Sequence, residues 1–407
     1  MKLLNIKASS ACVLPFLATQ FRRGLCAPEE SKNNYRFEKF NYTDPTASSA
    51  KITFPITPAD ADFLRQDSNS VSVVLPQEDC VGLSFTELKK NLMKKRLYPP
   101  PHPEDGAFWK EFKEVMKVVG KLKQYQHEKN TKINPLPEVM PRITHLWNGK
   151  LDITEVAEAV HDEFPGVYHA QLIAEWTATG SLERKSNLFP QQNNRDILRF
   201  HFMLSDLVGH AIRMVGPCVF ALKWDVGMAR PEEVAWKIMN DELEVPEEHR
   251  ERVLKLLRKI NYETFESSAD FTAYPEGSPP HPSYPAMHSA ASASSFWLSV
   301  TMNLSEEQLC EARMLDYSIA YARTVAGVHY GTDNITGLMM GQEILAQKLP
   351  RYLQDQYGAD YTAVKEAVEE ALFDWTEFKK SDCWRDCKYV KFRTRQDQID
   401  RCATDDS

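Results

Sequence analysis

Apolar residues recur at intervals of three and four positions along much of the chain, and this spacing places them on one face of an α-helix. The segments with this pattern are 108–125, 153–164, 197–214, 253–260, 309–326 and 361–375. The strict alternation of apolar and polar residues that marks a half-buried strand is sparse. The pattern therefore predicts an all-α protein, folded as a single large helical-bundle domain over residues 60–407.

Capping residues and prolines place some of the helix boundaries. Ser84 with Glu87, and Ser305 with Gln308, have the spacing of a capping box. In this motif the serine hydroxyl and the later side chain each accept a hydrogen bond from a free backbone N–H. Five prolines fall within residues 265–287, which excludes one continuous helix there and predicts a long loop.

The chain changes character twice before the predicted domain. Residues 1–28 carry four basic side chains, no acidic one and a short apolar run, as targeting segments do. A secretory signal and an organellar transit peptide fit this pattern equally well. We therefore expect a secreted or organellar protein if residues 1–28 are a targeting segment, and a cytoplasmic protein otherwise. Residues 29–59 are rich in Ser, Asn, Thr and Pro and are predicted to be extended or disordered.

Composition narrows the classes of partner. A formal net charge of −8 without a dense basic patch argues against a nucleic-acid binder, which needs a basic face to neutralise phosphates. No uncharged apolar run is long enough to cross a bilayer, so no membrane span is expected. The eight cysteines lack the CxxC spacing of a zinc site. Cys383, Cys387 and Cys402 could form a disulfide in the tail, and most of the eight are expected to be free thiols.

Three segments carry candidate chemistry. In the first, Lys223 and Arg230 are seven residues apart, which is nearly two helical turns, so on one continuous helix they would share a face. Pro231 predicts a break directly after Arg230. Glu232 and Glu233 then suit the first turn of the next helix, where acidic side chains complement the helix dipole.

The second segment delivers His288 from the proline-rich loop to the start of a predicted Ala- and Ser-rich helix, residues 289–296. The first amides of a helix have no intrahelical partner, and they favour a nearby anion. A lone histidine at such a position more often caps or packs. A functional role for His288 is therefore supported only when the other two segments are considered with it.

The third segment places Arg323 six residues before His329. Gly327 and Gly331 bracket the histidine and are predicted to loosen the helix around it. Asp333 follows one turn later, where a carboxylate can accept the second ring proton of the histidine and fix its tautomer. In order along the chain, the three segments supply three cations, two histidines and one orienting acid, a set that suits an oxyanion.

Together these segments resemble a three-part signature shared by the vanadium haloperoxidases and the type 2 phosphatidic-acid phosphatases: Lys-x6-Arg-Pro, Pro-Ser-Gly-His and Ser-Arg-x5-His-x3-Asp. The residues around the first two parts are similar to those of the soluble haloperoxidases, and the algal bromoperoxidase-like and bacterial soluble members are the most similar. Two departures remain. Ala322 replaces a serine, and Ala286-Met287 replaces Ser-Gly, which removes a hydroxyl donor that Ser283 or Ser289 would have to supply.

The resemblance implies a role for each matched residue. Vanadate, one per subunit, would be held through its oxygens and ligated by a single histidine nitrogen. The implied oxyanion ligands are Lys223, Arg230, Arg323 and the backbone amide of Met287, and the implied vanadium ligand is His329. Asp333 would orient that histidine, and His288 would act as the acid-base residue. His281, seven residues before His288, would lie at the halide position and favour bromide or iodide.

The implied activity is oxidation of bromide or iodide by hydrogen peroxide to a hypohalous acid equivalent, which halogenates a small organic acceptor. A homo-oligomer is also implied. Two alternatives stay open. A soluble phosphatase would use His329 as the nucleophile and His288 to protonate the leaving group. A decayed relative would have lost turnover through Ala286-Met287 and would serve as a helical binding scaffold.

Overall fold

The computed structural model describes residues 85–103, 105–128, 166–190, 200–201, 203–204, 207–260, 267–272 and 281–385. Several predictions lie outside these residues. They are the targeting segment 1–28, the extended segment 29–59, the capping residue Ser84, the helix 153–164 and the proline-rich residues 273–280.

The described chain is almost entirely helical, so the prediction of an all-α protein is confirmed. The elements of the first half are α4 (Phe85–Lys94), α5 (Gly106–Glu128), α8 (Gly166–Ala178), β1 (Glu183–Arg184), η5 (Ser186–Leu188), α10 (Leu207–Val226), α11 (Pro231–Met239), α12 (Glu247–Ile260) and η6 (Ser268–Phe271). The elements of the second half are α13 (Met287–Ala291), α14 (Ser294–Thr301), β2 (Met302–Asn303), α15 (Glu306–Val325), α16 (Gly331–Tyr357), α17 (Tyr361–Ala371), η7 (Trp375–Lys380) and α18 (Asp382–Arg385). The two short strands pair antiparallel.

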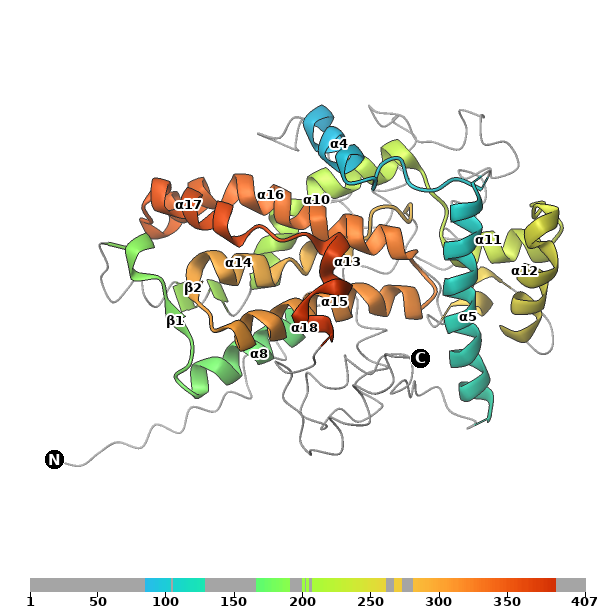
Figure 1. Ribbon diagram of the computed structural model, residues 1–407, viewed down its shortest axis with the longest axis horizontal. Coiled ribbons are helices and arrows are strands. Elements are labelled where there is room, and N and C mark those ends of the chain that lie inside the picture. Colours follow the sequence, from blue (N-terminus) through green and yellow to red (C-terminus); the bar gives the residue numbers. More distant parts are fainter. Residues whose placement is uncertain are drawn as a thin grey trace.

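The helices that carry the three segments pack together at the centre of the molecule (Figure 1). Helix α16 packs most extensively on the short α13, and α10 and α15 each pack against both of these helices. A Cβ atom added at Gly337 or Gly341 of α16 would collide with the carbonyl oxygens of Ala286 and Ala290. The absence of side chains at these two positions therefore brings the two backbones into direct contact, and it fixes the start of α13 beside the start of α16.

The turn between α15 and α16 is built by local signals that the sequence contains. The predicted capping box starts α15: Gln308 N–H donates to Ser305 Oγ (3.2 Å), and Ser305 N–H donates to Gln308 Oε1 (3.0 Å). Gly327 adopts φ +83° just after α15 ends, and a Cβ there would lie 2.8 Å from the Phe271 carbonyl oxygen. Because only glycine adopts this conformation freely, α15 stops and the chain turns.

His329 lies in this turn, outside both helices. Gly327 acts as predicted, because it ends the upstream helix. Gly331 is instead the first residue of α16. The histidine is therefore held by a tight interhelical connection rather than by a loosened helix.

One disulfide ties the C-terminal part to the centre. Cys310 of α15 is bonded to Cys383 of α18, 73 residues later in the sequence. The prediction that Cys383 pairs within the tail is wrong, since the fold places α18 against α15. Sequence proximity favoured the nearer cysteines, whereas the packing of α15 and α18 selected the distant one.

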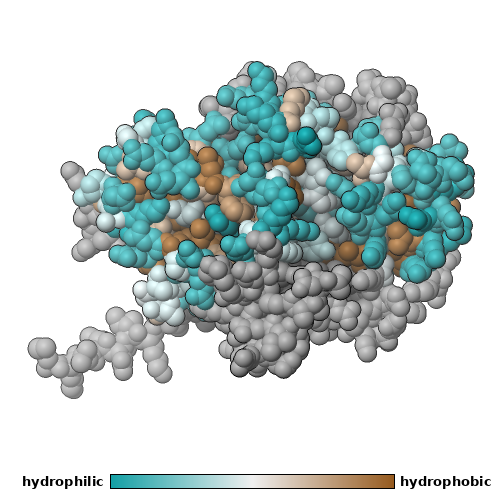
Figure 2. All heavy atoms as spheres, in the orientation of Figure 1, coloured by the Kyte–Doolittle hydropathy of each residue, from teal (hydrophilic) through white to brown (hydrophobic). Residues whose placement is uncertain are grey.

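Hydrophilic side chains cover much of the coloured surface in Figure 2, with hydrophobic side chains showing between them. Among the residues that the structure describes, no helix combines the length and the apolar character needed to cross a bilayer.

Candidate oxyanion-binding site

The two cations of the first segment belong to different elements. Lys223 lies in the last turn of α10, which ends at Val226, and Gly227 follows with φ +66°. Arg230 directly precedes α11, with Pro231 at the first helical position. The prediction that the cations share one helical face is therefore wrong. The left-handed glycine stops the helix before Arg230, whereas the sequence analysis placed the break after it.

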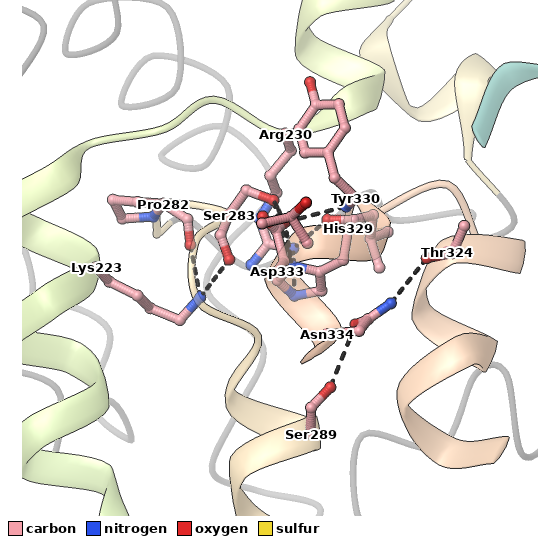
Figure 3. A network of polar contacts seen from close by, with 12 residues as sticks. Lys223, Arg230, Pro282, Ser283, Ser289, Thr324, His329, Tyr330, Asp333 and Asn334 are labelled. Atoms are coloured by element: carbon pink, nitrogen blue, oxygen red, sulfur yellow. Dashed lines mark hydrogen bonds and ion pairs between the residues drawn. The ribbon is translucent and has the colours of Figure 1, made fainter. Parts of the chain in front are cut away.

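Both cations are nevertheless directed into one buried cluster. Lys223 is fully buried, and its ammonium donates to the carbonyl oxygens of Pro282 (2.7 Å) and Ser283 (2.8 Å), as Figure 3 shows. The N–H of Ser283 in turn donates to the carbonyl oxygen of Met228 (2.7 Å). These contacts fasten the loop before His288 to the connection between α10 and α11.

Arg230 joins that loop to the α15–α16 turn. Its Nε donates to the His281 carbonyl oxygen (3.0 Å) and its Nη1 to the Val328 carbonyl oxygen (2.9 Å). The same Nη1 lies 3.4 Å from Nε2 of His329. Its backbone N–H donates to Glu233 (2.9 Å), in the first turn of α11, where the sequence analysis placed that acid. The guanidinium is thus fixed with one nitrogen beside the histidine ring.

His329 is oriented by Asp333, as the sequence analysis predicted. The Nδ1 atom of His329 lies 3.0 Å from Oδ2 of Asp333. The same carboxylate oxygen accepts hydrogen bonds from the Ser283 hydroxyl (2.5 Å) and from the Tyr330 N–H (3.0 Å). Since the carboxylate accepts the Nδ1 proton, the Nε2 atom of a neutral ring keeps its lone pair. That lone pair is on the side of the ring where Arg230 lies.

The electrostatics keep this ring neutral. Burial lowers the pKa of His329 well below its usual value, and the charges of Arg230 and Lys223 lower it further. Burial likewise lowers the pKa of Lys223, Arg230 adds to the effect, and Asp333 opposes it. Burial raises the pKa of Asp333 to about 7, while hydrogen bonds from Ser283 and Tyr330 act in the other direction. The cluster therefore carries an excess of positive charge that an anion would relieve.

Arg323 supplies the third cation. It is 1% exposed and lies in the last turn of α15, directly before the turn that carries His329. Figure 3 also shows a second set of polar contacts, in which Ser289 Oγ donates to Asn334 (3.2 Å) and Asn334 donates to Thr324 Oγ1 (2.8 Å). These contacts tie α13 to both α15 and α16, so they fix the three elements that surround the site.

His288 is the second residue of α13 and is partly buried. After burial and the two basic residues, His288 also contributes to the lowered pKa of both His281 and His329. The predicted helix 289–296 is instead two helices, because the chain leaves the helical path at residues 292–293. The histidine still lies at a helix start, as expected.

Met287 is the first residue of α13, and its side chain packs towards α10. Its Cε atom would lie 3.6 Å from a Cβ built on Gly216, so this glycine leaves room for the long side chain. The two serines considered as replacement donors are both engaged elsewhere. Ser283 donates to Asp333, and Ser289 donates to Asn334.

His281 joins the same cluster. Its Nδ1 lies 3.1 Å from Nη2 of Arg230, and its ring meets Phe220 edge-on at a centroid distance of 5.2 Å. Burial, Lys223 and Arg230 lower the pKa of His281 well below its usual value. The ring is therefore neutral. Beside the guanidinium of Arg230, it gives the candidate site a polar surface.

Sequence reasoning missed two features of the site. It treated Ser283 as a substitute donor to the anion, whereas the Ser283 hydroxyl donates to Asp333. The signal in the sequence was that Ser283 lies between Pro282 and Pro285, which restrict the backbone of this loop. It also did not predict that the Lys223 ammonium donates to the carbonyl oxygens of Pro282 and Ser283 and so holds this loop.

The donor set fits an oxyanion. The described residues contain no group of three or more His, Cys, Asp or Glu side chains that could hold a cation. The described residues instead include three buried basic side chains, and two of them, Lys223 and Arg230, act on the carboxylate of Asp333 or on the neutral imidazole of His329. Guanidinium and ammonium groups are strong donors to vanadate or phosphate oxygens, and a free imidazole nitrogen can bond to the central atom.

Comparisons with known proteins agree with this chemistry. No curated protein matches the chain. A family model described as the PAP2 superfamily matches residues 206–346, which contain all three segments. Residues 206–346 therefore form a PAP2 superfamily domain, in a superfamily that includes both phosphatases and vanadium haloperoxidases.

Proposed function

We propose that this protein is a vanadate-dependent haloperoxidase that oxidises bromide or iodide with hydrogen peroxide and releases a hypohalous acid equivalent. The observation that carries the proposal is the neutral His329, whose Nδ1 is paired with Asp333 and whose Nε2 lies beside Arg230. A histidine in this state can donate its lone pair to the central atom of an oxyanion.

The depth of the site favours a small resident oxyanion over a bulky phosphate ester. The relevant side chains are almost fully buried, with exposed fractions of 0% for Lys223, 1% for Arg230 and Arg323, and 2% for His329. An ester needs room for its leaving group. Inorganic vanadate, peroxide and halide are each only a few atoms in size, and they need no such room.

Each basic residue has a task in this proposal. Lys223, Arg230 and Arg323 would neutralise the oxygens of vanadate, and the Met287 N–H at the start of α13 would add a backbone donor. His329 would be the direct ligand. Bound vanadate supplies Lewis-acid activation of hydrogen peroxide.

The remaining residues move protons and place the halide. His288, at the start of α13, would accept a proton from hydrogen peroxide as it binds and return it to the oxygen that leaves. His281, neutral and beside Arg230, would form a polar wall for the halide. The guanidinium next to it would favour the approach of an anion such as bromide.

The test is a matrix assay on purified full-length protein. Bromination of a monochlorodimedone-type acceptor should require vanadate, peroxide and bromide together, and omission of any one should abolish it. His329→Ala should be inactive under all conditions. His210→Ala, which changes a histidine that contacts Arg213 and Tyr352, should keep its activity.

The same preparation should be assayed for hydrolysis of an aryl phosphate. Hydrolysis that is lost in His329→Ala, with no halogenation at any halide, would replace the proposal with a phosphatase. Absence of both activities, together with no binding of vanadate or phosphate by calorimetry, would identify a catalytically decayed scaffold.

A further inference from the structure

A cavity opens beside the α15–α16 turn, on the side formed by α5 and η7. It has a volume of about 490 Å³ and is lined by residues of α5, α15, the start of α16 and η7. Thr324 and Gly331, which flank the turn that carries His329, are among the lining residues. The cavity therefore adjoins the oxyanion cluster without sharing its basic side chains.

One wall of the cavity is aromatic. Tyr317 and Tyr321 lie one turn apart on α15, and their rings are stacked with centroids 6.3 Å apart and planes 10° apart. Trp375 of η7 adds a third ring and is 2% exposed. Stacked aromatic faces attract a flat apolar ring, and they also attract a cation through their quadrupoles.

The α5 side of the cavity is acidic. Glu111 and Glu114 both line it. Glu111 is anchored by the backbone N–H of Thr332 (3.4 Å) and by its hydroxyl. Burial raises the pKa of Glu111, and the charge of Glu114 contributes; burial and Glu114 also raise the pKa of Tyr321. A positive charge placed beside the two carboxylates would relieve their mutual repulsion.

A buried donor in the cavity wall lacks an acceptor. The indole Nε1 of Trp375 is buried and makes no hydrogen bond within the part of the chain that the structure describes. Buried polar groups are normally paired, and a buried N–H without an acceptor costs stability. A ligand with a hydroxyl or carbonyl oxygen would supply the missing acceptor.

Two lysines also line the cavity, and both are exposed. The ammonium of Lys379 lies over the ring of Trp384, 5.8 Å from its centroid. Lys117 belongs to α5. Their charges are therefore screened by solvent, whereas the buried part of the cavity holds the carboxylate of Glu111 and the aromatic rings.

We propose that this cavity binds a small aromatic ammonium compound. The ring of the ligand packs against Tyr317 and Tyr321, its cation lies beside Glu114 and Glu111, and an oxygen substituent accepts from the Trp375 indole. The proposal concerns binding alone, so it stands independently of the proposed haloperoxidase activity.

Calorimetry on the full chain tests the proposal without vanadate, peroxide or halide. Three probes of similar size differ in charge: tyramine is cationic, tyrosol is neutral and 4-hydroxyphenylacetate is anionic. We expect tyramine to bind about tenfold more tightly than tyrosol, because a partly desolvated cation gains from both carboxylates and rings. The anionic probe should show no measurable binding.

Two substitutions locate the site. Glu114→Gln should weaken tyramine binding about two- to fivefold, as expected for an exposed ion pair, and leave tyrosol unchanged, because tyrosol carries no charge. Trp375→Phe should weaken both probes by a similar factor, because it removes the N–H and keeps a ring. Glu366→Gln, an equivalent change at an exposed position of α17, should alter neither.

Three outcomes would each overturn the proposal. They are no binding of tyramine at millimolar concentration, equal affinity for the three probes, and equal tyramine affinity in Glu114→Gln and Glu366→Gln. A negative halogenation assay with intact tyramine binding would instead contradict the proposed function and leave the binding site standing.

Discussion

The hydroxyl of Ser283 donates to Oδ2 of Asp333 across a separation of 50 residues, and it also lies 3.2 Å from Nδ1 of His329. The loop before α13 thereby reaches the carboxylate that orients the histidine. Lys223 holds the backbone of the same loop through the carbonyl oxygens of Pro282 and Ser283. The position of the imidazole thus depends on a serine far away in sequence.

Ser283→Ala removes one hydrogen bond to a charged acceptor. We expect the free energy of unfolding to fall by about 1.5–3 kcal/mol, and turnover or vanadate affinity to fall roughly tenfold. The pKa of Asp333 should rise, because the Ser283 hydrogen bond lowers it. Urea denaturation and vanadate titration measure these effects. Ser299→Ala, which removes a hydroxyl bonded to the Phe296 carbonyl oxygen, serves as the control and should leave vanadate affinity intact.

The stability of the protein without an oxyanion should depend on Asp333 in a defined pH window. Burial raises the pKa of this residue to about 7 in the folded state, against about 3.9 when unfolded. The folded protein therefore binds more protons between these values, and the free energy of unfolding contributed by Asp333 falls as pH rises from about 4 to about 7.

Asp333→Asn removes this titration. The free energy of unfolding of the variant minus that of the native protein should increase from pH 4 to pH 7 and level off above it. Denaturant titrations at several pH values measure this difference. A difference that stays constant, or that decreases across the window, would contradict the assignment.

Gly327→Ala tests the turn that carries His329. The new Cβ would adopt an unfavourable φ of +83° and would meet Phe271 O and Val119 Cγ2, each at 2.8 Å. We expect a loss of about 2–4 kcal/mol, combining backbone strain with steric overlap, and weaker oxyanion binding because the histidine moves. Gly358→Ala has φ +64° but no atom within 4 Å, so it should cost about 1 kcal/mol and leave binding unchanged. Equal losses of stability in the two variants would refute this account.

Met287→Ala separates the packing role of this residue from its role in the site. The variant keeps the backbone N–H at the start of α13 and loses the side chain that packs towards Gly216. We expect the melting temperature to drop, with a cost of about 1–2 kcal/mol for a half-buried side chain. Vanadate affinity should stay within about twofold, since the amide remains. A large loss of affinity would show that the side chain itself shapes the anion site.

Cys383→Ala tests the contribution of the disulfide to Cys310. The bond closes a long loop, so its loss should reduce the free energy of unfolding by about 2–4 kcal/mol. Denaturation of the variant under non-reducing conditions measures this. Cys310 lies near the start of α15, far along the helix from Arg323. The folded variant should therefore still bind vanadate. Unchanged stability would show that packing of α18 on α15 suffices without the bond.

Several features could be predicted because their causes are local. Helical spacing indicated α5, α12, α15 and α17, and the capping box placed the start of α15 within one turn. The pairing of His329 with Asp333 followed from a separation of four residues. Each of these depends on atoms that are neighbours in the sequence, so the physical cause is visible there.

Other features depend on contacts between distant segments. The break of α10 after Val226 requires Gly227 in a left-handed conformation. Glycine can adopt several backbone conformations, and the packing of the residues after it selects this one. The partner of Cys383 is decided by the docking of α18 on α15. The hydroxyl of Ser283 reaches Asp333 only because Gly337 and Gly341 let α16 touch α13.

From the sequence alone it followed that the protein is helical, that three ordered segments hold the cations, histidines and acid of the candidate oxyanion site, and that Asp333 is placed to orient His329. Only packing explains why Lys223, Arg230 and Arg323 are all buried, why Lys223 and Arg230 lie in one cluster, and why burial and the charges of these two residues keep His329 neutral. Charge and spacing are properties of the chain, whereas desolvation exists only once the helices have packed.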